Sequence, residues 1–327
     1  MRALLIVNPR ATSTTRLRRD VIASALASAV ELEVVETRYR GHATKLAASA
    51  RKEGYGLVLT LGGDGTVNEV VNGILGPGAH EPAAAQGGSE QWQADLPPAH
   101  ELPALAALPG GSANVFTGAL RLPRDPVDAT GQILQALAEN RERTIGLGMA
   151  DGRYFTFNSG LGLDAEVVRA VQGVRAHGRT VTPSLYVRLA LRHFYRQTDR
   201  NLPAVAIELA DRPPSEPVFV GIVSNTAPWT YLGRREVHAN PKAGFETGLD
   251  VFAMRTMSSF NMAYAIGQML TAKGTELRGR NILSFHDQAQ LTLRASRPVA
   301  FQIDGEYVGE REHVRFTSIP RALRVVA

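Results

Sequence analysis

Short apolar runs alternate with stretches of helical periodicity along the first 140 residues of the chain. The run ALLIV at residues 3–7 is typical of a strand, and the apolar residues that follow, from Leu17 to Val30, recur at helical spacing. Asp125 followed by Pro126 is a typical beginning of a helix. The pattern predicts further strands and helices at 32–36, about 42–53, 57–61, 104–108 and 126–140. Strands that alternate with helices pair in parallel, because a parallel return needs a crossover long enough to hold a helix. We therefore predict an open, mostly parallel α/β sheet.

The pattern changes at about residue 143. Two strand-like runs flank Asp151-Gly152, a dipeptide typical of a hairpin turn, and similar pairs of runs recur at 203–226 and from 281 to the end. Helices are expected at 164–172, 182–196 and 258–271. We predict two domains: an α/β domain at 1–142 and a mainly antiparallel β domain at 143–327. Whether the last strand returns to the first domain stays open.

Residues 76–102 interrupt the first domain. They are rich in Pro, Gly, Ala and Gln and have no apolar period, so they cannot bury enough surface to offset the entropy of ordering. We predict that 76–102 is a mobile insertion, and the strand at 104–108 resumes the fold.

Composition narrows the classes of protein. The 327 residues, 44% of them hydrophobic and 20% charged, fit two globular domains, and the lack of cysteine excludes disulfides and thiolate chemistry. The formal net charge of +5 suits an anionic partner, but the basic residues are dispersed and not interleaved with aromatics, so we expect no nucleic-acid partner. No apolar stretch reaches transmembrane length. We expect a cytoplasmic protein, with peripheral attachment to the inner face of a membrane as an open alternative.

The segment GGDGTVNEVVNG, residues 62–73, carries the most chemistry. It follows a buried strand and enters a helix, so Gly62, Gly63 and Gly65 would let backbone N–H groups approach an anion at the helix N-terminus. The plain alternative is a tight turn that uses glycine only for its backbone freedom. Asp64 favours the first interpretation, a turn that binds phosphate, because a carboxylate beside a phosphate has a role when it binds the metal of a nucleotide or accepts a proton.

This segment, with Ile74, resembles the signature of the diacylglycerol kinase catalytic-domain family, which is related to sphingosine kinases and, through the shorter GGDGT core, to NAD kinases. Other stretches resemble the family in the same order along almost the whole chain: Val7-Asn8-Pro9, Thr37 with Gly41-His42-Ala43, 108–114 (LPGGSAN), 157–164 (FNSGLGLD) and 303–306 (IDGE). The resemblance implies an NAD kinase-like first domain and an ATP-dependent lipid kinase. Such an enzyme transfers the γ-phosphoryl group of ATP, with Mg²⁺, to a hydroxyl of diacylglycerol or a similar lipid at a membrane surface.

The resemblance also assigns residues. The expected catalytic residues are Asp64, Asp304 and Glu306, with the last two as the acidic pair that takes the proton of the lipid hydroxyl. By sequence alone, Asp304-Gly305 would be only a hairpin turn. The expected nucleotide-binding residues are Asn8, Pro9, Thr37, Gly62, Gly63, Asp64, Gly65, Thr66, Asn68, Glu69, Ser112 and Asn114.

The chain departs from the family pattern at two loops. Ala11-Thr12-Ser13 stands where the family often has Ser-Gly, and Thr247 replaces an aspartate of a loop that often holds a structural magnesium ion. The metal ligands are unknown from the sequence, because the histidines lack metal-ligand spacing.

Two alternative functions stay open: an NAD kinase-like enzyme, and a non-catalytic nucleotide- or lipid-binding protein of the same fold. A homodimer also stays open. The arginine-bearing segment 184–196 is either a helix that covers the β domain, which its pattern favours, or one that lies on an anionic membrane.

Overall fold

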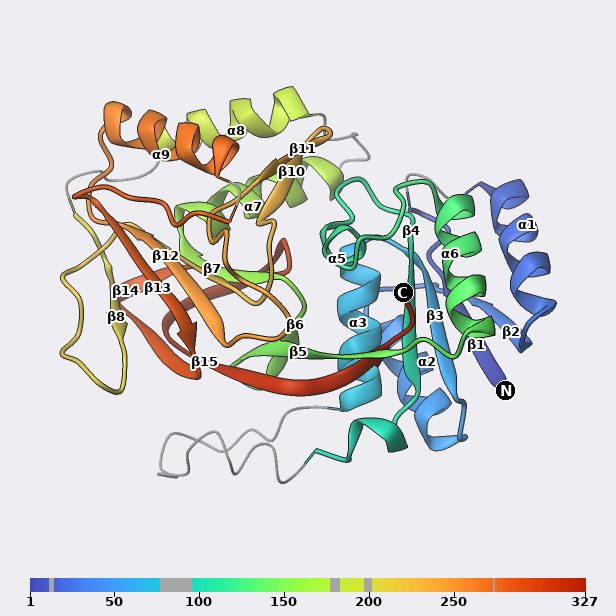
Figure 1. Ribbon diagram of the computed structural model, residues 1–327. Helices are drawn as coiled ribbons and strands as arrows, with labels where there is room; N and C mark the ends of the chain where they lie inside the picture. The colour runs from blue at the N-terminus through green and yellow to red at the C-terminus, as the bar shows by residue number, and fades with distance from the viewer. Residues whose placement is uncertain (12–14, 77–95, 177–182, 197–201, 273) are drawn as a thin grey trace. The chain divides into compact units, whose positions relative to one another are not determined.

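The computed structural model describes residues 1–11, 15–76, 96–176, 183–196, 202–272 and 274–327 (Figure 1). The chain forms two compact units. The first comprises residues 1–147, 152–154 and 319–327, and the second comprises residues 148–151 and 155–318.

The first unit is built on a parallel sheet. Its strand order is β2 (Glu31–Glu36), β1 (Arg2–Val7), β3 (Leu57–Gly62) and β4 (Ala104–Pro109). Strands β3 and β4 are buried along their whole length, and β1 is buried after Arg2, as the continuous apolar runs predict. Because the strands run in one direction, the loops that follow them meet at one edge of the sheet.

Helices cover this sheet in two packed pairs, α1 with α6 and α2 with α3. The helices are α1 (Arg16–Ala27), α2 (His42–Lys52), α3 (Asp64–Leu75), α5 (Val115–Ala119) and α6 (Pro126–Ala138). The close packing of α3 on α2 requires Gly73, because a Cβ atom there would lie 2.4 Å from the carbonyl oxygen of Thr44. Asp125 caps α6 as predicted: its carboxylate accepts hydrogen bonds from the backbone N–H groups of Val127 and Asp128.

The predicted insertion at 76–102 is described only at its ends, and residues 77–95 lie outside the described residues. Its last part differs from the prediction. Residues Ala99–Glu101 form a 3₁₀ turn, and Leu102 is buried. The guanidinium of Arg324 donates hydrogen bonds to the carbonyl oxygens of Ala99 and Leu102, so this end of the segment is tied to the first unit.

The second unit contains an antiparallel sheet. Its order is β13 (Ile282–Gln288), β12 (Leu249–Met254), β9 (Val220–Ser224), β7 (Asn158–Gly162), β14 (Gln290–Ile303) and β15 (Glu306–Val325), with β8 (Val205–Glu208) also paired to β14. The predicted fold class, a mostly parallel α/β part followed by a mainly antiparallel β part, is confirmed. Within the segment 203–226, the chain turns back on itself through the antiparallel bridges Val205–Val218 and Leu209–Arg212, as the sequence pattern predicts. The ladders of the two strands lie elsewhere, because β8 pairs with β14 and β9 pairs with β7 and β12.

The shorter elements of the chain complete the fold. They are β5 (Arg143–Ala150), β6 (Arg153–Phe155), α7 (Leu163–Ala176), α8 (Pro183–Arg196), β10 (Thr230–Leu232), β11 (Arg235–Val237) and α9 (Ser259–Thr271). Asp151 and Gly152 join β5 to β6 with φ values of 45° and 79°, as a type I′ turn requires. Residues 319–327, which end β15, belong to the first unit, where Val325 pairs in parallel with Leu105.

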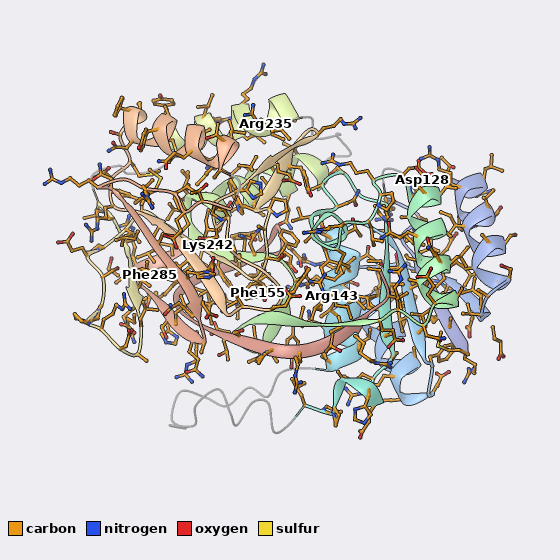
Figure 2. All side chains as sticks on the ribbon, in the orientation of Figure 1. Asp128, Arg143, Phe155, Arg235, Lys242 and Phe285 are labelled. Atoms are coloured by element: carbon orange, nitrogen blue, oxygen red, sulfur yellow. The ribbon has the colours of Figure 1, made fainter. Side chains whose placement is uncertain are left out.

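Aromatic side chains form the centre of the core of the second unit. Phe155, labelled in Figure 2, meets Phe316 edge to face with 6.2 Å between ring centroids, and Phe301 meets the same ring at 6.5 Å. All three are buried. Within the described part of the chain, no helix combines the length and apolar character needed to cross a bilayer.

Candidate functional site

The loops at the carboxyl ends of the parallel strands are tied to one another. The backbone N–H of Asn8, just after β1, donates to the carbonyl oxygen of Leu61 at 2.9 Å, and its side-chain amide lies 3.3 Å from the hydroxyl of Thr66 in α3. On the other side of β1, the N–H of Thr37 donates to the carbonyl oxygen of Val7 at 2.8 Å. The structure thus brings together three of the residues expected to bind nucleotide, Asn8, Thr37 and Thr66, with Pro9 exposed beside them.

The glycine turn between β3 and α3 packs against the loop that follows β4. A Cβ atom on Gly111 would lie 2.6 Å from the Cα atom of Gly63, and one on Gly63 would lie 3.2 Å from the Cα atom of Gly111. A Cβ atom on Gly62 would lie 2.6 Å from the hydroxyl of Thr66. Packing therefore explains Gly62 and Gly63. Gly65, in the first turn of α3, is exposed, and a Cβ atom there would meet nothing within 4 Å.

Asp64 is the first residue of α3, and its side chain joins the same two loops. Its Oδ1 atom accepts a hydrogen bond from the backbone N–H of Phe116 at 3.1 Å, near the start of α5. A carboxylate at this place also interacts favourably with the N-terminal end of α3. Asp64 thus has a structural contact at the edge of the sheet where it was expected to act.

The loop after β4 holds its own shape through Asn114. This residue has a φ of 53°, and its side-chain amide exchanges two hydrogen bonds of 2.8 Å with the backbone N–H and carbonyl of Gly111. Asparagine is among the few non-glycine residues that readily adopt this left-handed conformation. Ser112 lies inside the loop and is exposed.

Two residues expected to bind nucleotide make framework contacts instead. The carboxylate of Glu69 accepts hydrogen bonds from the backbone N–H groups of Gly41 and Ala43, at 2.8 and 3.1 Å, and so caps the start of α2. Asn68 is buried: its amide donates to the carbonyl oxygen of Tyr154 at 2.9 Å, and its oxygen accepts from Arg153 at 2.7 Å. These contacts account for both side chains without a nucleotide.

The predicted acidic pair lies at the turn between β14 and β15 in the second unit. Asp304 and Gly305 have φ values of 47° and 72°, as expected for the hairpin turn. Asp304 is buried, and its carboxylate accepts four hydrogen bonds, from the backbone N–H groups of Thr156, Phe157 and Asn158 and from the hydroxyl of Thr156, at 2.7 to 3.2 Å. Its contacts are those of a structural clamp. Glu306, half-buried, begins β15.

A buried chain of polar side chains supports this turn and was not predicted from the sequence. The side-chain amide of Gln302 lies 2.8 Å from Oδ2 of Asp164 and 2.8 Å from the side-chain oxygen of Asn158, and its own oxygen accepts from the N–H of Gly305 at 2.9 Å. Burial raises the pKa of Asp164 from 3.8 to about 6, and the hydrogen bond from Gln302 opposes the rise. The signal in the sequence that could have indicated this buried chain is Asp164, which ends the apolar stretch 157–164.

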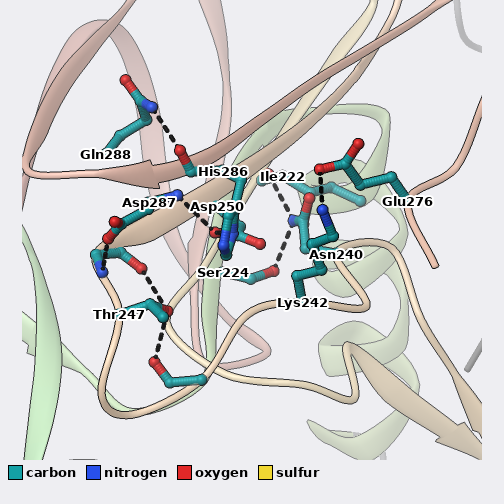
Figure 3. A network of polar contacts seen from close by, with 12 residues as sticks. Ile222, Ser224, Asn240, Lys242, Thr247, Asp250, Glu276, His286, Asp287 and Gln288 are labelled. Atoms are coloured by element: carbon teal, nitrogen blue, oxygen red, sulfur yellow. Dashed lines mark hydrogen bonds and ion pairs between the residues drawn. The ribbon is translucent and has the colours of Figure 1, made fainter. Parts of the chain in front are cut away.

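The loop that carries Thr247 forms a closed network (Figure 3). The hydroxyl of Thr247 lies 3.0 Å from the carbonyl oxygen of Gly244, and Asp287 accepts from the N–H of Gly248 at 2.6 Å. Oδ1 of buried Asp250 lies 2.7 Å from Nδ1 of His286 and accepts from the N–H of Asp287 at 3.0 Å; burial raises the pKa of Asp250. Among the described residues, no three His, Asp or Glu side chains gather as metal ligands. The polar side chains of this loop that could bind a metal ion make hydrogen bonds within the network, so the loop does not fit a structural magnesium site.

Together, the fold and these loops define a protein with a glycine-rich turn at one edge of a parallel α/β sheet and an antiparallel second unit. Residues 2–149 match the family model of the diacylglycerol kinase catalytic domain. The resemblance seen in the sequence is therefore confirmed for this part of the chain.

Curated relatives carry related names. The chain is 30% identical over 166 residues to a probable lipid kinase YegS-like of Chromohalobacter salexigens, covering 51% of this chain and 45% of the relative. It is 30% identical over 159 residues to a diacylglycerol kinase of Bacillus subtilis, covering 47% and 43%. The matches thus span less than half the length of these relatives, and they support a lipid kinase family.

Solved structures agree on the fold. The structure of a diacylglycerol kinase from Bacillus anthracis superposes with a TM-score of 0.69 at 17% identity, covering 99% of this chain and 96% of that one. At this identity the likeness concerns the fold alone.

Proposed function

We propose that this protein is an ATP-dependent lipid kinase that transfers the γ-phosphoryl group of ATP to the hydroxyl of diacylglycerol or a similar lipid. The observation that carries the proposal is the turn into α3. Gly65 leaves open space beside the backbone of the first helical turn, with Asp64 next to it, at the edge where doubly wound sheets bind ligands. The family match over residues 2–149 and the names of the relatives support the same reaction class.

The residues at the turn fit a nucleotide accompanied by Mg²⁺. Magnesium bound through phosphates needs only one or two protein carboxylates, and Asp64 supplies one. The ion would neutralise the charge that develops on the phosphoryl oxygens. Asn8 and Thr66 already lie beside one another at this edge, and backbone N–H groups at the start of α3 would bind the phosphates.

We assign the role of general base to Glu306 and not to Asp304. The four hydrogen bonds that Asp304 accepts engage its oxygens with the framework of the turn. In the proposed step, the lipid oxygen attacks the γ-phosphorus as Glu306 takes its proton. The bond from the γ-phosphorus to the bridging oxygen breaks, and ADP leaves.

Transfer of label tests the proposal. The purified protein is incubated with γ-labelled ATP, Mg²⁺ and separate acceptors in detergent micelles: diacylglycerol, monoacylglycerol, ceramide, sphingosine and undecaprenol, with NAD in buffer. Label on a lipid is the expected result. Label on NAD would support the NAD kinase alternative, and no label on any acceptor would support a binding protein.

Substitutions assign the roles. Asp64→Asn keeps an oxygen that accepts from Phe116 but removes the charge, so we expect the fold to survive and turnover to fall by about 100-fold or more. Its matched control is Asp128→Asn, an exposed aspartate in the first turn of α6 (Figure 2). Glu306→Gln should lower kcat by about 100-fold or more with little change in ATP affinity, whereas exposed Glu310→Gln on the same strand should change neither. Full turnover by Glu306→Gln would contradict the assignment of the base.

A further inference from the structure

Helix α9 presents an uncharged face to solvent. Its sequence, SFNMAYAIGQMLT, contains no ionisable acidic or basic side chain apart from the tyrosine hydroxyl. Phe260 is 79% exposed, Tyr264 52% and Ile266 43%. Phe260 and Tyr264 are four residues apart and so lie on one face of the helix. A surface helix ordinarily turns charged residues to water, so a large apolar face here indicates something that covers it.

Helix α8 extends this face and adds positive charge. The hydroxyl of Tyr195 in α8 lies 3.1 Å from that of Ser259, which begins α9, and Figure 1 shows the two helices side by side. Leu191 and Tyr195 are about half exposed, and Arg188 and Arg192 are exposed on the same helix. Neither helix contains an acidic residue.

The exposed face is held in place by the rest of the second unit. Ala265 and Met269 of α9 are buried against the sheet and β11. The guanidinium of Arg235, labelled in Figure 2, donates to the carbonyl oxygen of Leu270 at the end of the helix. The side chain of Gln268 exchanges two hydrogen bonds with the backbone of Arg278, at 2.8 and 2.9 Å. The face is therefore a fixed feature of the fold.

Further cations follow α9 along the chain. Arg278 and Arg280 are exposed, and the hydrogen bonds of Gln268 hold Arg278 next to the helix. Glu276, the acidic residue nearest to these two arginines along the chain, forms an ion pair with Lys242 at 2.7 Å. Exposed aromatic and aliphatic side chains bordered by arginines, with no acidic residue on either helix, are the composition of an interfacial element on anionic lipid.

We propose that the exposed face of α8 and α9, defined by Arg188, Leu191, Arg192, Tyr195, Phe260 and Tyr264, docks on the surface of an anionic phospholipid bilayer. The aromatic rings enter the headgroup region, where such side chains are favoured, and the arginines contact lipid phosphates. The further proposal that a lipid kinase meets its substrate at this face rests on the proposed function. The affinity of this face for lipid is measurable without any turnover.

Sedimentation with vesicles tests the docking. We expect the protein to bind vesicles of equal parts phosphatidylcholine and phosphatidylglycerol, to bind phosphatidylcholine alone much more weakly, and to be released by salt. Arg188→Gln with Arg192→Gln should weaken binding about 25-fold, at about fivefold for each charge near the surface. Phe260→Ser with Tyr264→Ser should weaken it about tenfold or more.

A matched control comes from the first unit. Leu17 is 74% exposed on α1 and Arg16 is exposed beside it, so Leu17→Ser with Arg16→Gln removes the same kinds of side chain elsewhere. This variant should bind vesicles like the parent. Equal binding by all variants, or no binding to anionic vesicles, would overturn the proposal. So would a dimer in size-exclusion chromatography that Phe260→Ser dissociates, because a second copy would then cover the face.

Activity separates this proposal from the proposed function. Dioctanoylglycerol disperses in water, so its phosphorylation should not need docking, whereas long-chain diacylglycerol in anionic vesicles should. The Phe260→Ser and Tyr264→Ser variant should keep the first activity and lose the second. Failure to phosphorylate either lipid, with vesicle binding intact, would refute the kinase and leave the docking face. Phosphorylation of both lipids without vesicle binding would refute the docking face alone.

Discussion

Replacing Gly65 by alanine separates what the glycine turn does for the fold from what it does for a ligand. Gly65 is the second residue of α3, it is exposed, and a Cβ atom there would meet nothing within 4 Å. Alanine in a helix is favoured over glycine because it loses less conformational entropy on folding. The substitution should therefore stabilise the protein unless a ligand needs the space.

The expected effects of Gly65→Ala on stability and on kcat/KM for ATP have opposite signs. Gly→Ala replacements at compatible helical positions stabilise by about 0.4–1 kcal/mol, which corresponds to a rise in Tm of about 1–3 °C for a protein of this size. If the phosphates of ATP approach the backbone at Gly65, the methyl group separates them from at least one N–H donor. A hydrogen bond to a charged group contributes about 1.5–3 kcal/mol, so kcat/KM for ATP should fall about 10- to 100-fold.

The assay compares two variants by thermal unfolding and by label transfer at limiting ATP. Gly131→Ala is the matched control, because Gly131 is also an exposed helical glycine, in α6, with nothing within 4 Å of its Cβ position. Both variants should gain stability, and only Gly65→Ala should lose kcat/KM for ATP. If Gly65→Ala turns over ATP like Gly131→Ala, phosphates do not bind at this turn and the argument from the open space is refuted.

Three further substitutions test the framework contacts. Burial raises the pKa of Asp164 to about 6, so ionising it costs the folded state about 3 kcal/mol. The free energy of unfolding of the parent should therefore fall as the pH rises from about 4 to about 6. Urea unfolding of Asp164→Asn over the same pH range should show a smaller fall. Glu69→Ala leaves two backbone N–H groups at the start of α2 without their acceptor. It should lower the free energy of unfolding by about 1–2 kcal/mol and leave KM for ATP unchanged. A raised KM with an unchanged Tm would instead place Glu69 in the nucleotide site. A Cβ atom on Gly148 would lie 2.1 Å from the ring of Phe155, so Gly148→Ala should destabilise the protein by about 1–3 kcal/mol. Adding Phe155→Leu to this variant should recover part of that loss. An unchanged Tm for Gly148→Ala alone would contradict the packing.

Local patterns were sufficient to predict most elements of the fold. The apolar runs gave β1, β3 and β4 because each is a continuous buried strand of a parallel sheet. Asp125 with Pro126 predicted the start of α6, and Asp151-Gly152 and Asp304-Gly305 predicted hairpin turns, because these signals depend on neighbours in the sequence.

Pairing between distant segments was not predictable in the same way. The sequence pattern predicted the turn within 203–226 but not that β8 pairs with β14, which begins about 80 residues later along the chain. A short strand carries no local signal for its partner when that partner is remote, since the register depends on which apolar faces meet in the core. The clamp of Asp304 on Thr156 joins residues 148 positions apart and was missed for the same reason.

A sequence motif combines residues needed by the fold with residues needed by the chemistry, and the structure offers a way to divide them. Gly63 and Gly111 approach each other too closely for side chains, and Glu69 and Asp304 cap backbone N–H groups. Each would be required even in a protein that binds nothing. Packing does not require Gly65, because no neighbour in the described structure fills the space beside it, and the same holds for Gly131 in α6. A folded chain gains stability by placing alanine at either position. Gly65 differs from Gly131 in its place beside Asp64 at the start of α3, where we propose that phosphates bind, so comparison of the two alanine variants tests whether a ligand needs the exposed backbone at Gly65.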